Sequence, residues 1–114
     1  MVQTVFQVAL GGAAGALLRW GVVQGAGFAL GTLAVNVAGS FAIGLVWVIL
    51  PERMQPLLMV GLLGGFTTFS AFSLDTLRLI EGGRAGSALA YAGASVILSL
   101  VACWAGMTLG RIAA

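Results

Sequence analysis

The sequence predicts an all-α integral membrane protein with four transmembrane helices, and its composition and charge spacing together make this prediction. Of the 114 residues, 61% are hydrophobic and 7% are charged, whereas a soluble domain carries roughly 25% charged residues. A soluble protein of this size needs many polar groups to cover its surface. The composition therefore excludes a water-soluble domain and a disordered chain. A net charge of +2 forms no basic patch, so nucleic-acid binding is not indicated.

Five arginines and three acidic residues divide the chain into charge-free runs at 1–18, 20–51, 54–74 and 85–110. A helix crosses the bilayer core, about 30 Å thick, with about 20 apolar residues, so each run holds one crossing. We predict a single membrane domain over residues 1–114, with helices at about 4–24, 28–50, 57–80 and 85–109.

The first helix is predicted at about 4–24, and the first four residues of the chain carry no charge. A signal peptide would carry positive charge there, so we expect this segment to remain as a helix. Its apolar residues are not confined to alternate positions, which favours a helix over a barrel strand. Gly11 and Gly15 fit the small-x-x-x-small pattern of close helix packing.

Two rows of polar residues with a four-residue spacing mark the second and fourth helices: Thr32, Asn36 and Ser40, and Tyr91, Ser95 and Ser99. Residues four apart share one face of a helix, and buried polar groups in lipid need partners. Each hydroxyl can also bond a carbonyl of its own helix. Two aligned rows, one containing an amide, favour a polar path.

The third helix, at about 57–80, is predicted to be broken near its middle. Pro56 suits a helix start. Gly64 and Gly65 are followed by Thr67 and Thr68, and Gly lowers helix stability by roughly 1 kcal/mol per residue. Irregular backbone at membrane depth lines cavities or is buried in protein, and its free carbonyls can coordinate a cation. The alternative is that the glycines serve close helix packing.

Phe69 and Phe72 lie three residues apart on one face of this helix. The positive edges of their rings can meet an anion; the alternative is contact with lipid or protein. The chain has no His and one Cys, Cys103, and no hydroxyl has a base beside it for nucleophilic catalysis. We therefore expect no enzyme. Asp75 lies in the last third of its helix, so no carboxylate is expected deep in the membrane.

The arginines divide almost evenly between the two sides of the membrane. Arg53 and Arg111 are expected on the side of the termini, and Arg19, Arg78 and Arg84 on the other. The excess of Lys and Arg that orients membrane proteins is nearly absent. This allows insertion in both directions and hence an antiparallel dimer.

Three motifs, in order and over most of the chain, resemble those of the CrcB/Fluc fluoride channel family: GGAAGALLRW at 11–20, GTLAVNVAGSF at 31–41 and GGFTTFSAFS at 64–73. The resemblance implies an antiparallel, dual-topology homodimer in the plasma (inner) membrane. It would export fluoride passively and lower fluoride in the cytoplasm.

The resemblance also implies roles for individual residues. The fluoride path would include Asn36, Phe69, Ser70, Phe72, Tyr91, Ser95 and Ser99. Backbone carbonyls of Gly64 and Thr67 would hold a structural Na⁺ at the dimer centre, and Arg19 would be structural or lie at a vestibule. The sequence departs from the family at Ala71, where Thr is common, so one hydroxyl of the path is missing.

Two other functions fit parts of the sequence. A small multidrug-resistance-type, proton-coupled exporter is also a four-helix dimer, but it needs a carboxylate in its first helix, where this chain has none. A non-transporting assembly subunit would explain the many glycines. It would not explain the polar rows or the broken third helix.

Overall fold

The computed structural model describes residues 1–114 as a bundle of four helical segments, each long and apolar enough to cross a membrane. Three segments are continuous helices: α1 (Val2–Ala26), α2 (Leu30–Ile49) and α5 (Ala85–Ala113). The other segment consists of η1 (Glu52–Met54), η2 (Pro56–Leu63), α3 (Gly64–Phe66) and α4 (Phe69–Glu81). The protein is therefore a multi-pass membrane protein, as expected from its charge-free runs.

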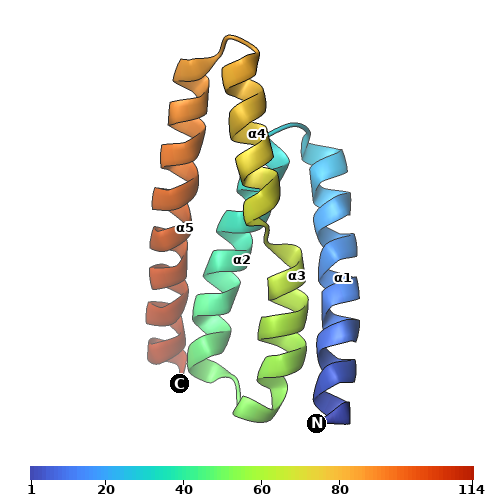
Figure 1. The fold of residues 1–114 in the computed structure, drawn as a ribbon. Helices are drawn as coiled ribbons and strands as arrows, with labels where there is room; N and C mark the ends of the chain where they lie inside the picture. The colour runs from blue at the N-terminus through green and yellow to red at the C-terminus, as the bar shows by residue number, and fades with distance from the viewer.

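Both chain termini lie at the same end of the bundle (Figure 1). The bundle is 47 Å long, enough for a hydrocarbon core of about 30 Å with its interfaces. Helix α1 packs against η2 and α3, whereas α5 packs against α2 and α4. The connections at Gly27 and Gly83 use the left-handed backbone, with φ of 88° and 77°, which glycine adopts at no steric cost.

Glycines bring helix backbones into direct contact. A Cβ atom on Gly15 would overlap the backbone carbonyl of Leu62 in η2, and one on Gly106 in α5 would overlap the carbonyl of Phe41 in α2. Gly11 faces the η2 backbone in the same way. The packing expected of the first-helix glycines is thus present, and small residues allow this close approach in membranes.

The third segment is interrupted at Thr67 and Thr68, near the middle of the bundle (Figure 1). Their ψ angles are 159° and 128°, which are extended values. The two preceding glycines are helical. A Cβ on Gly65 would lie 2.7 Å from the Gly12 carbonyl oxygen of α1, so Gly65 serves helix packing. The π-helical turns of Pro56–Leu63 were not expected.

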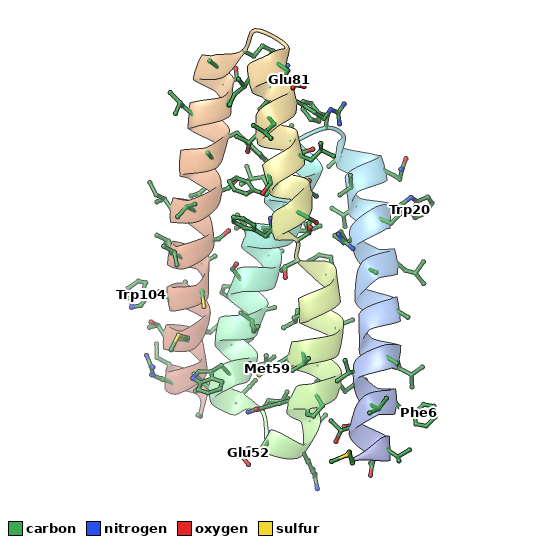
Figure 2. The ribbon with its side chains drawn as sticks, viewed as in Figure 1. Phe6, Trp20, Glu52, Met59, Glu81 and Trp104 are labelled. Atoms are coloured by element: carbon green, nitrogen blue, oxygen red, sulfur yellow. The ribbon has the colours of Figure 1, made fainter.

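The two ends of the bundle carry charge and its sides carry large apolar residues. Figure 2 shows Glu52 and Glu81 at opposite ends of the bundle. Trp20 and Trp104 point outwards, and each is 65% exposed. This distribution matches a protein surrounded by lipid, whose tails replace water around the apolar sides.

We predict that Gly106→Ala destabilises the protein, whereas Gly93→Ala does not. A methyl group at Gly106 meets the α2 backbone, while a Cβ at Gly93 in the same helix has nothing within 4 Å. Overpacking of this kind costs about 1–3 kcal/mol. Thermal unfolding of the two variants in detergent measures the difference. Equal melting temperatures would contradict the contact between α2 and α5.

Candidate functional site: a polar cavity beside the broken helix

A cavity of about 520 Å³ lies beside the interruption, between α2, α4 and α5. It brings together members of both polar rows, the broken backbone and the two phenylalanines. The residues that line it are Asn36, Gly39, Ser40, Ile43, Gly64, Thr67, Thr68, Phe69, Phe72, Ser95, Val96, Ser99 and Leu100. No charged side chain is among them.

The side-chain amide of Asn36 in α2 bonds the interrupted backbone through both its oxygen and its nitrogen. Its Oδ1 accepts a hydrogen bond from the Thr68 N–H at 2.8 Å, and its Nδ2 donates to the Thr68 carbonyl at 2.9 Å. An Asn side chain has two N–H donors. One N–H is therefore left over on a residue that lines the cavity.

The side chains of Thr67 and Thr68 bond backbone groups at the ends of the two helices that meet here. The Thr67 hydroxyl donates to the Leu63 carbonyl at 3.0 Å. Thr68 is the N-cap of α4, and its Oγ1 accepts from the Ala71 N–H at 3.1 Å, as N-cap hydroxyls commonly do. The Ser70 Oγ lies 3.2 Å from the same Oγ1. Ser70 is exposed and lies outside the cavity wall.

This rearrangement releases backbone carbonyls, among them those of Gly64 and Thr67. In an unbroken α-helix the Thr68 N–H would donate to Gly64 and the Ala71 N–H to Thr67, four residues earlier. Here the Thr68 N–H donates to Asn36, and the Ala71 N–H donates to the Thr68 side chain. The Gly64 and Thr67 carbonyls thus lose their helical donors, and both residues line the cavity.

Ser95 supplies a free donor from the opposite wall. Its side chain is buried, at 6% exposure, and its hydroxyl has no hydrogen-bond partner. Leaving such a group unsatisfied costs roughly 1–3 kcal/mol, so a bound anion or water would stabilise it. Ser40 of α2 and Ser99 of α5 also line the cavity.

Aromatic rings extend along one side of the cavity. The Phe69 and Phe72 ring centroids are 5.4 Å apart with planes at 51°, and those of Phe72 and Tyr91 are 5.5 Å apart at 40°. Phe72 packs against the buried cluster of Leu79, Ala88 and Tyr91, whereas Phe69 is 76% exposed in the single chain. The structure thus places the predicted phenylalanine pair on one face, toward the cavity.

Asp75 is a buried residue that sequence reasoning missed. Its side chain is 7% exposed, and its Oδ2 accepts from the Thr32 hydroxyl at 2.8 Å and, more weakly, from the Tyr91 hydroxyl at 3.4 Å. Its burial was not predicted, because position along a helix does not determine burial. A usable signal existed: Thr68 and Asp75 lie seven residues apart, and they bond Asn36 and Thr32, which lie four residues apart in α2.

Two other predicted residues lie apart from the cavity. Tyr91 is not among the lining residues, and its hydroxyl proton is directed to Asp75. Arg19 lines a second cavity of about 510 Å³, together with Trp20, Asp75 and Arg78. The roles of Tyr91 and Arg19 stay predictions.

Four membrane-crossing segments, and a cavity with polar groups beside a helix break, are typical of a membrane channel or transporter, since irregular backbone at this depth is found where it is buried in protein or lines such a cavity. Residues 6–107 match the family described as CrcB-like protein, Camphor Resistance (CrcB). The chain belongs to this family.

Curated relatives agree over nearly the whole chain. A protein of Paracoccus denitrificans named fluoride-specific ion channel FluC is 52% identical over 97% of both chains. A protein of Cereibacter sphaeroides with the same name is 51% identical over 97% of both. One of Pseudomonas syringae pv. tomato, again so named, is 44% identical over 98% of this chain and 100% of that protein.

We predict that Asn36→Ala destabilises the protein and speeds amide hydrogen exchange at the interruption around Thr68. The variant leaves the Thr68 N–H and carbonyl without their partner, at about 1–3 kcal/mol. Thermal unfolding in detergent and amide hydrogen exchange around Thr68 measure the two effects. Ser40→Ala is the matched control, since Ser40 lines the same cavity without holding the break. Slow exchange at Thr68 in Asn36→Ala would show that another contact maintains the interruption.

Proposed function

We propose that the chain forms a fluoride-selective channel through which fluoride leaves the cell passively across the plasma (inner) membrane. The observation that carries this proposal is the cavity beside the broken helix, whose walls offer neutral donors and no charged side chain. The relatives named fluoride-specific ion channels support the choice of ion. The mechanism is permeation, and no covalent step is involved.

The cavity can replace the water that fluoride loses on entry. Fluoride is small and strongly hydrated, so a pore must supply substitute donors. The free Ser95 hydroxyl and the second N–H of Asn36 are two such donors. The edges of the Phe69 and Phe72 rings carry partial positive charge. Neutral groups bind the anion weakly enough to release it, which conduction requires.

The remaining predicted residues extend this path in both directions. Ser99 lies one helical turn beyond Ser95 on the cavity wall. Tyr91 lies one turn to the other side, against the Phe72 ring. Ser70 adds a hydroxyl beside Thr68, at the position where α4 begins.

The functional unit in this proposal is an antiparallel homodimer inserted in both directions. Phe69 borders the ion cavity but is 76% exposed in one chain, and a second copy packed against this face would enclose its ring. The near-even division of arginines between the two sides permits both orientations.

A structural Na⁺ fits the released carbonyls of Gly64 and Thr67. Unwound backbone carbonyls are the ligands that hold Na⁺ in broken-helix transporters, and these two have lost their helical donors. No group of His, Cys, Asp or Glu that would suit a transition metal is present. When bound, the ion supplies a fixed positive field near the cavity.

We expect liposomes that contain only this protein to release fluoride without a proton gradient. Phe72→Ile should abolish the flux because it removes the ring edges from the path. Phe6→Ile is the control, since Phe6 is an exposed ring on α1 away from the cavity (Figure 2). A fluoride electrode measures efflux. Absence of wild-type flux would refute the channel, and flux that requires a proton gradient would favour the proton-coupled exporter.

We expect replacement of Na⁺ by N-methyl-D-glucamine to lower both the dimer fraction and the fluoride flux, because the proposed ion lies at the dimer centre. Glutaraldehyde cross-linking in liposomes measures the dimer fraction. Epitope tags on the termini should be reached from both sides of the membrane. Labelling from one side only would refute dual topology, and a dimer unaffected by Na⁺ removal would refute the ion's structural role.

A further inference from the structure

The second cavity lies beyond the Asp75 hydrogen bonds, in the half of the bundle that contains the connection between α1 and α2. Its volume is about 510 Å³, and its walls include Arg19 of α1, Phe28 of the connection, and Asp75 and Arg78 of α4. This half ends at the turn that carries Glu81 (Figure 2). The cavity is therefore on the side of the membrane opposite the chain termini.

Phe28 holds the Arg78 side chain at the wall of this cavity. The Arg78 guanidinium carbon lies 4.3 Å from the centroid of the Phe28 ring, which is a cation–π contact. Phe28 stands between Gly27 and Ala29, whose φ angles are 88° and 67°. A positive φ is uncommon for a residue other than glycine, so the connection adopts an unusual turn where it presents this ring.

The charges that line the cavity leave it positive. Two guanidinium groups, those of Arg19 and Arg78, face one carboxylate, that of Asp75. The hydrogen bonds of Asp75 come from Thr32 and Tyr91, and not from either arginine. Both arginines are therefore available to act on an ion in the cavity.

The two cavities are joined by the residues around Asp75. Thr32 and Asp75 line the second cavity. Tyr91 donates to Asp75 and contacts the Phe72 ring, and Phe72 lines the first cavity. In the proposed function, the positive cavity thus lies at one end of the fluoride path.

We propose that Arg78, held by Phe28, makes the second cavity a site that concentrates small monovalent anions at one mouth of the fluoride path. This inference rests on the proposed function. Clefts lined by one sign of charge raise the local concentration of a counter-ion and its rate of entry. Arg78 acts through the electric field of its positive charge, so it affects the rate at which anions enter. The first cavity, with its neutral donors, determines which anion passes.

The test compares fluoride efflux of Arg78→Gln with that of Arg84→Gln in liposomes, at low fluoride and constant Na⁺. Arg84 carries the same charge on the same side of the membrane but does not line the cavity. N-methyl-D-glucamine gluconate adjusts the ionic strength. At about 0.01 M the Debye length is about 30 Å, and at 1 M it is about 3 Å. We expect Arg78→Gln to slow efflux about threefold at low ionic strength and little at high ionic strength.

Two further variants separate the field of Arg78 from a structural role. Arg78→Lys retains the charge and should restore most of the flux. Phe28→Leu removes the ring that holds the Arg78 guanidinium and should reduce flux with the same salt dependence. This variant tests the inference even if Arg78→Gln fails to fold. A loss that is equal at all ionic strengths, or an equal loss in Arg84→Gln, would overturn the inference. Wild-type protein without flux would refute the proposed function itself, whereas normal flux in Arg78→Gln would refute only the role of Arg78.

Discussion

The paired hydrogen bonds between the Asn36 side chain and the Thr68 backbone are the interaction on which the rest of the site depends. Stopping a helix inside a membrane leaves backbone groups without partners, and lipid offers none. Asn36 supplies both a donor and an acceptor at this point. The chain can therefore restart as α4, with Thr68 as its N-cap. The cavity, the free carbonyls of Gly64 and Thr67 and the direction of the phenylalanine rings all follow from this interruption.

The distribution of hydrogen bonds separates structural polar groups from those available to an ion. Thr67, Ser73, Thr76 and Thr108 bond carbonyls of their own helices. Thr32 and Tyr91 bond Asp75 across helices. Ser95 is the buried side chain left without a partner. A path made of such neutral donors differs from a charged one because it holds an anion without trapping it.

Charge spacing predicted the four helices, because a charge within lipid is costly and marks the ends of crossings. The break was predicted from Gly64, Gly65, Thr67 and Thr68, but the threonines form it and Gly65 instead packs on α1. Most residues that the resemblance implied line one cavity. Asp75 and the contact between Phe28 and Arg78 were missed, because they depend on which helices and connections meet, and periodicity within one helix does not carry that information.

The contact between Gly12 and Gly65 has a mechanical consequence. No side chain separates the two helix backbones there, so no rotamer change can absorb a displacement of α1 relative to α3. Closely packed interiors have low compressibility and transmit strain. The distance between α1 and α3 is therefore expected to stay constant when bilayer thickness or tension changes.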